Sequence, residues 1–77
     1  MNLEEIKENY PHLLLANGYD AAILGVCMRA NLEAVCYDCK KVLEILMNDM
    51  SEIEALEFFE FNIIGAYVGE HTPVFLY

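Results

Sequence analysis

Positive charge is scarce in this 77-residue chain and is missing from its second half. Four Lys and Arg side chains stand against 13 Asp and Glu, and none of the four lies beyond Lys41. The formal net charge is −9, with six of the carboxylates between residues 44 and 60. Four cations cannot supply the phosphate contacts that dominate nucleic-acid affinity, so direct binding of DNA or RNA is not expected. A concentrated block of carboxylates instead attracts a basic partner at long range.

Long apolar runs are also missing, although 57% of the residues are hydrophobic. Runs such as 13–16 and 21–24 are far shorter than the roughly 20 residues that a membrane-spanning helix needs. The N-terminus is acidic and polar, whereas a secretory signal begins basic and then turns apolar. Three cysteines without such a signal predict free thiols in a cytoplasm. The apolar excess in so short a chain predicts a homodimer.

Residues suited to catalysis are few. The chain contains one Ser, one Thr and two His, and its four glycines are too scattered for a phosphate-binding loop. His71 beside Glu70 has the composition of a general base held by a carboxylate, but such a pair is more often a solvated loop. The sequence therefore predicts neither an enzyme nor a cofactor.

The first half of the chain predicts a helix followed by a hairpin. In a helical N-terminal segment, 1–18, the N-cap Asn2 predicts a short helix over 3–9, which Pro11 either ends or follows with a second turn. The apolar runs at 21–28 and 33–37 predict two antiparallel strands, because the four residues between them are too few for a crossover. Gly25 inside the first run predicts a bulge or a close approach by another element.

The second half predicts two helices and a short strand. Asp38 is a good N-cap for an amphipathic helix over 39–49. Ser51 with a Glu three residues later forms a capping box for a helix over 52–67. Pro73 then favours extended backbone, which predicts a terminal strand at 74–77.

These elements describe a single α+β domain over residues 1–77, with 19–77 as its core. Their order is α-β-β-α-α-β. Helices are expected to pack on one face of a small antiparallel sheet made of the hairpin and the C-terminal strand. The proline at the start of that strand favours an edge position or a first-residue position.

The helix predicted over 52–67 carries most of the acidic block. A helical wheel places its core contacts on one face, namely Ala55, Leu56, Phe59, Ile63 and Ala66. The other side combines carboxylates with apolar groups: Glu54, Glu57, Glu60, Phe61, Ile53 and Ile64. One interpretation is that these apolar groups are buried against a second layer, a dimer partner or the terminal strand. The other is a protein-binding surface, in which the three glutamates attract a basic partner while Phe61 and Ile64 anchor it.

The cysteines and the cations offer weaker candidate sites. Cys36 and Cys39 form a C-x-x-C pair, and Cys27 could face Cys36 across the hairpin. Three sulfurs and a histidine could hold zinc, but the second pair of a zinc ribbon is missing, which favours ordinary free thiols.

The cations predict an alternative function. Arg29 lies near the hairpin turn, and Lys40 and Lys41 follow the second strand. Together they could bind the anionic group of a nucleotide or a metabolite in an oligomeric ligand-binding protein. Nothing else in the sequence requires such a ligand.

Residues 57–73 read E-F-F-E-F-N-I-I-G-A-Y-V-G-E-H-T-P. This segment resembles the E-F-F-E-F-N-I-I-G-A-Y-V-G-E-x-T-P ending of a group of small proteins from tailed phages and prophages, and the resemblance extends from Tyr19 to the C-terminus. No activity is established for that group. Small acidic phage proteins are often inhibitors of host nucleases, including anti-CRISPR proteins, and some imitate the negative field of DNA. By analogy the resemblance implies an accessory protein that binds and inhibits a host protein with a basic surface, in the host cytoplasm.

Overall fold

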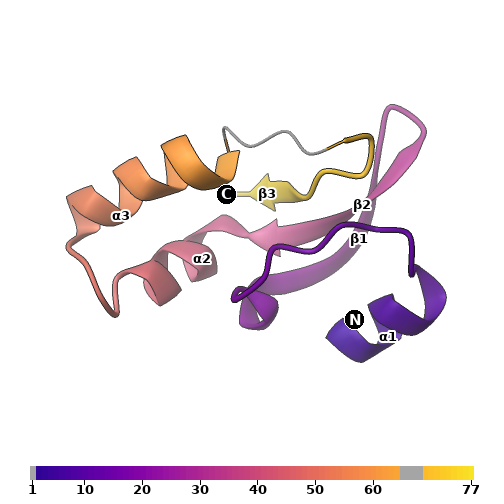
Figure 1. The fold of residues 1–77 in the computed structure, drawn as a ribbon, viewed down its shortest axis with the longest axis horizontal. Coiled ribbons are helices and arrows are strands. Elements are labelled where there is room, and N and C mark those ends of the chain that lie inside the picture. The colour runs from indigo at the N-terminus through magenta and orange to yellow at the C-terminus, as the bar shows by residue number, and fades with distance from the viewer. Residues whose placement is uncertain (1, 65–68) are drawn as a thin grey trace.

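The described part of the chain, residues 2–64 and 69–77 of a computed structural model, follows the predicted order α-β-β-α-α-β. Its helices are α1 (Leu3–Asn9), α2 (Cys39–Leu46) and α3 (Glu52–Phe58), and its strands are β1 (Ile23–Arg29), β2 (Leu32–Asp38) and β3 (Val74–Leu76). A short 3₁₀ turn at Asp20–Ala22 and a π-helical turn at Phe59–Ile64 complete the regular structure. Figure 1 shows α2 and α3 together at one end of the molecule and α1 near the other.

Each of the three helices begins at the N-cap that the sequence predicts. Side-chain oxygens of Asn2, Asp38 and Ser51 accept hydrogen bonds from backbone N–H groups two or three residues further on, at 2.9, 3.0 and 3.2 Å. These N–H groups would otherwise lack a partner in the first helical turn. Local hydrogen bonding therefore fixes the start of every helix.

The N-terminal helix has the predicted bounds, Leu3–Asn9. No second helical turn follows it: residues 10–18 are not helical, which corrects the wider expectation of a helical segment over 1–18. Pro11 explains the difference, because a proline disfavours helical backbone at the residue before it. Tyr10, at that position, has a φ of −135° and a ψ of 57°. The chain beyond it continues to Leu13, which is buried in the same core as Ile6 of α1.

The hairpin confirms both predicted strands and the bulge. β1 and β2 pair in antiparallel register from Arg29–Leu32 to Ile23–Tyr37, and the register shifts between Ile23 and Gly25. The turn contains only Ala30 and Asn31, both with positive φ (50° and 71°). Such a two-residue turn matches the right-handed twist of the paired strands.

The third strand corrects the prediction of an antiparallel sheet. β3 pairs with β2 in parallel, with Val74 opposite Cys36 and Leu76 opposite Asp38, so the sheet is mixed and its order is β1-β2-β3. Two helices lie between β2 and β3 in the sequence, and this connection is long enough to return the chain to the starting end of the sheet. The long connection permits parallel pairing of β3 with β2, whereas the short hairpin loop allows only antiparallel pairing of β1 with β2.

The helices cover one face of this sheet. Tyr37 stacks on Phe75 with ring centroids 5.5 Å apart, and Phe75 meets Phe59 edge to face at 5.3 Å. The buried core around them is completed by Ile6, Leu13, Ala22, Val35, Cys39, Val42, Leu46 and Ala55. The other face, here called the open face, lies outside this connected core. It carries Gly25, Cys27, Ala34, Cys36, Val74 and Leu76, of which Ala34 is fully buried.

The predicted core face of α3 is confirmed only in part. Ala55 and Phe59 are buried and Ile63 is half-buried, but Leu56 is 39% exposed, so it is not a core residue. Ala66, the fifth predicted contact, lies outside the described residues. Among the described helices, none is long and apolar enough to cross a membrane.

Candidate functional site: an acidic and aromatic hollow on α3

The start of α3 positions the first acidic side chain. The backbone N–H of Ser51 donates to Glu54 Oε1 at 3.1 Å, while the backbone N–H of Glu54 donates to Ser51 Oγ at 3.2 Å. These bonds form the predicted capping box. Because Ser51 hydrogen-bonds the carboxylate, the pKa of Glu54 is lowered. Glu54 therefore stays ionised and is held at a fixed point on the surface.

The end of α3 turns an aromatic ring outward. At Phe59 the α-helix becomes a π-helical turn, which holds more than the 3.6 residues of an α-helical turn. Phe59 and Ile63, four residues apart, both lie against the core, as they would in an α-helix. Phe61, midway between them, is left pointing away, and it is 81% exposed. Burial of Phe61 against the terminal strand of its own chain is thereby excluded.

A shallow hollow lies between these two ends. It has a volume of about 330 Å³ and is lined by Met50, Glu54, Glu57, Phe58, Phe61 and Asn62. We call these six residues the acidic–aromatic hollow. Three of the predicted partner-binding residues, Glu54, Glu57 and Phe61, therefore lie together. Met50, Phe58 and Asn62 were not in the predicted site; Phe58, next to a buried phenylalanine in the sequence, is 38% exposed.

The remaining predicted residues lie elsewhere or outside the description. Glu60 is not part of the hollow, and its charge acts on Tyr77. The pKa of Tyr77 is raised chiefly by its hydrogen bond with the Cys39 thiol, and Glu60 adds a smaller contribution of the same sign. Ile53 is 70% exposed but does not line the hollow. The side chain of Ile64 lies outside the described residues.

No cation neutralises the hollow within the described chain. Lys41 pairs with Glu44 at 3.5 Å, and this is the one Lys or Arg ion pair among residues 2–64 and 69–77. Glu54 and Glu57 are both exposed and have no such counter-charge. The hollow therefore combines uncompensated negative charge with accessible aromatic surface.

The cations of the alternative ligand site are not brought together. Arg29 ends β1 at the hairpin turn, where its guanidinium donates to the backbone oxygen of Glu70 at 3.1 Å. Lys40 and Lys41 begin α2, beyond the opposite end of β2. Seven-residue β2 separates the two places, a span of about 20 Å at the usual rise of a strand. One small anion cannot contact all three side chains.

The three cysteines are divided between the two sides of the sheet. Cys27 and Cys36 are half-buried on the open face, whereas Cys39 is buried in the core. Burial raises the pKa of the Cys39 thiol, and its hydrogen bond with Tyr77 partly offsets this. The described residues contain no group of three or more potential metal ligands, so the three-cysteine zinc site is not formed there.

The structure also brings together two histidines that are far apart in the sequence. The rings of His12 and His71 meet edge to face with centroids 5.1 Å apart. His12 Nε2 lies 3.6 Å from Glu33 Oε1, and His71 Nδ1 lies 2.7 Å from the backbone oxygen of Glu33. His71 is therefore held by β2, not by its neighbour Glu70. This cluster connects the N-terminal segment, the hairpin and the loop before β3.

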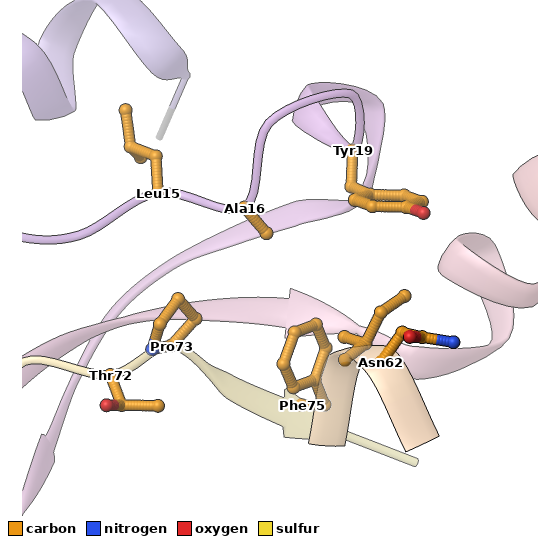
Figure 2. Close-up of a pocket in the computed structure, with 8 residues that line it drawn as sticks. Leu15, Ala16, Tyr19, Asn62, Thr72, Pro73 and Phe75 are labelled. Atoms are coloured by element: carbon orange, nitrogen blue, oxygen red, sulfur yellow. The ribbon is translucent and has the colours of Figure 1, made fainter. Parts of the chain in front are cut away.

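An apolar pocket of about 230 Å³ lies on the covered side of the sheet. Figure 2 shows Leu15, Ala16 and Tyr19 on one side of it and Thr72, Pro73 and Phe75 on the other. None of the three predicted ligand-binding cations lines it. Its volume is below the roughly 300–1,000 Å³ that is usual for small-molecule sites.

No family model matches the chain, nor does any curated protein or solved structure.

Proposed function

We propose that the protein is a non-enzymatic binding protein whose acidic–aromatic hollow docks on a basic surface of a partner protein and blocks it. The observation that supports this proposal is the position of Phe61. Its ring is 81% exposed beside two carboxylates that have no cation partner among the described residues. Leaving an aromatic ring in water forgoes the free energy of burial, which a partner would recover.

The two parts of the hollow contribute differently to binding. Glu54 and Glu57 attract a basic surface during approach, and Glu60 extends the negative field around α3. Phe61 and Phe58 offer the aromatic contact that slows dissociation once water is excluded. The affinity should therefore fall as salt concentration rises, since exposed charges are screened.

The proposed partner is a nucleic-acid-binding protein of host defence. The resemblance of residues 57–73 to phage and prophage proteins supports this class, as do known acidic inhibitors such as anti-CRISPR proteins. A channel that binds nucleic acid is lined with Lys and Arg. A carboxylate-rich helix could occupy such a channel in place of the phosphates.

The test is affinity capture of the tagged protein from a lysate of its natural host, followed by washes at low and then high salt. The key variant carries Glu54→Gln, Glu57→Gln and Glu60→Gln. Its matched control carries Glu4→Gln, Glu5→Gln and Glu8→Gln, three exposed residues of α1, and changes the net charge equally. Glutamine at position 54 can still complete a capping box.

The proposal predicts one partner that is retained at low salt, released at high salt and lost with the α3 variant only. The captured partner should then bind DNA less well when the wild-type protein is added. Equal binding by both variants would refute a role for this face. A partner that still binds DNA fully in the complex would refute inhibition by occupation of a nucleic-acid channel.

A further inference from the structure

Two thiols share the open face of the sheet. Across the hairpin Cys27 pairs with Ala34, and Cys36 pairs with Gly25. Residues two apart on a strand point to the same face, so these four positions form the corners of one square. The two cysteines occupy one diagonal, and the two smallest amino acids occupy the other.

The glycine leaves space beside the sulfurs, because a Cβ added at Gly25 would meet no atom within 4 Å. Ala34 contributes only a methyl group, which is itself fully buried. Both cysteines are half-buried, so solvent reaches them. The pKa of Cys36 is raised first by burial and then by its interaction with the Cys27 thiol, as expected for two neighbouring sulfurs.

The spacing of the pair suits a bridging ion better than a disulfide. Diagonal partners in an antiparallel sheet have Cα atoms about 7–8 Å apart, whereas disulfides usually join Cα atoms about 4.4–6.8 Å apart. A metal bonded to two sulfurs at about 2.3 Å each spans a wider gap than a direct S–S bond of about 2.05 Å. The hairpin can therefore hold an ion between the sulfurs without moving its backbone.

The number and type of ligands select the ion. Zinc requires four ligands, and no group of three or more potential ligands exists in the described chain. Thiolates are soft ligands that favour Cu(I), which is stable with two of them. Cys39 is excluded as a third ligand because it belongs to the core on the other side of the sheet.

We propose that Cys27 and Cys36 form a two-coordinate binding site for a soft monovalent metal ion, with Cu(I) as its chemical type. Two Cu–S bonds form on binding, the two thiol protons pass to solvent, and copper remains Cu(I). Because protons are released, the affinity rises with pH. The site is separate from the acidic–aromatic hollow, since α3 packs through Phe59 on the opposite face of the sheet.

The test is an anaerobic titration of the full chain with Cu(I) against a coloured Cu(I) chelator, with stoichiometry measured by native mass spectrometry. We expect one Cu(I) per chain. Cys27→Ser and Cys36→Ser should each weaken binding by more than about 100-fold, the upper end of the loss seen when a residue that only supports a metal ligand is changed. Cys39→Ser should retain the wild-type affinity.

If a cysteine variant folds poorly, thiol alkylation of the wild-type protein tests the same site without any substitution. In the folded wild-type protein, Cu(I) should protect Cys27 and Cys36 together from an alkylating reagent, as read by peptide mass spectrometry. Failure to compete with the chelator would overturn the proposal. So would one ion shared between two chains, or a loss of binding in Cys39→Ser that is as large as in the other two variants.

Discussion

The backbone N–H of Ala16 donates a hydrogen bond to the hydroxyl oxygen of Tyr37 at 2.8 Å, across 21 residues of sequence. Tyr37 is fully buried in β2 and stacks on Phe75. This bond attaches the non-helical segment after α1 to the centre of the sheet. It is a direct polar contact between the core and that segment.

Tyr37→Phe should destabilise the fold. The ring still fills its place, but the partly buried Ala16 N–H loses its acceptor, and such a loss costs about 1–3 kcal/mol. Urea unfolding followed by circular dichroism measures the change. Tyr10→Phe is the control, because Tyr10 packs against the same core and its hydroxyl makes no hydrogen bond to another described residue. An equal loss in both variants would contradict the role of the Ala16 bond.

Alkaline pH should weaken the fold through the same tyrosine. Burial raises the pKa of Tyr37 above its ordinary value of 10.0, and the Ala16 bond offsets this only in part. Above pH 10 the unfolded chain loses this proton more readily than the folded chain does, so the stability present at lower pH declines. Burial raises the pKa of Cys39 above 9.0 in the same direction. The free energy of unfolding, measured from pH 8 upward, should fall above about pH 9, and less steeply in Tyr37→Phe and Cys39→Ser than in the wild type.

The cap of α2 gives a third prediction. Asp38 accepts hydrogen bonds from the N–H groups of Lys40 and Lys41 at 3.0 and 3.4 Å. Asp38→Ala removes both and should cost about 1 kcal/mol, whereas Asp38→Asn keeps an N-cap acceptor and should change stability much less. Thermal unfolding of the two variants provides the measurement. Equal melting temperatures would show that the cap is unimportant.

Local features of the fold could be predicted from the sequence because neighbouring residues determine them. The helix starts are predictable because the N-cap side chains of Asn2, Asp38 and Ser51 accept hydrogen bonds from N–H groups only two or three residues further on. The hairpin likewise follows from two apolar runs joined by a short connection, and the bulge follows from the missing side chain of Gly25. The parallel pairing of β3 could not be predicted, because it depends on how the two intervening helices pack.

A helical wheel predicts three members of the candidate site. Glu54 and Glu57 in α3 and Phe61 in the π-helical turn all line the hollow, as expected. Glu60 also lies in that turn but does not line the hollow, which the wheel alone could not show. The cluster of His12 with His71 depends on contacts across 38 residues, between His71 and Glu33, which no local pattern contains.

The hairpin turn contains strain that a glycine should relieve. Ala30 has a φ of 50°, a left-handed conformation that costs an L-residue with a Cβ about 1–2 kcal/mol. Ala30→Gly should therefore stabilise the protein by about 0.5–1 kcal/mol, after the greater freedom of glycine in the unfolded chain is subtracted. Asn31→Gly should give a smaller gain, because asparagine already tolerates positive φ. The rise in melting temperature distinguishes the two, and a fall in Ala30→Gly would contradict the strain.

Phe59 and Phe61 are expected to have different roles, Phe59 in the stability of the fold and Phe61 in binding. Phe59 is buried against Phe75, and Phe59→Ala should cost about 3–5 kcal/mol. Phe61 is exposed, so Phe61→Ala should change the free energy of unfolding by less than about 0.5 kcal/mol. If the acidic–aromatic hollow binds a partner, the same Phe61→Ala variant should dissociate from it several-fold faster, as measured by surface plasmon resonance. If Phe61→Ala instead destabilises the isolated protein by an amount that depends on the protein concentration, a second copy of the chain covers the ring. A homodimer would then replace a foreign partner at this surface.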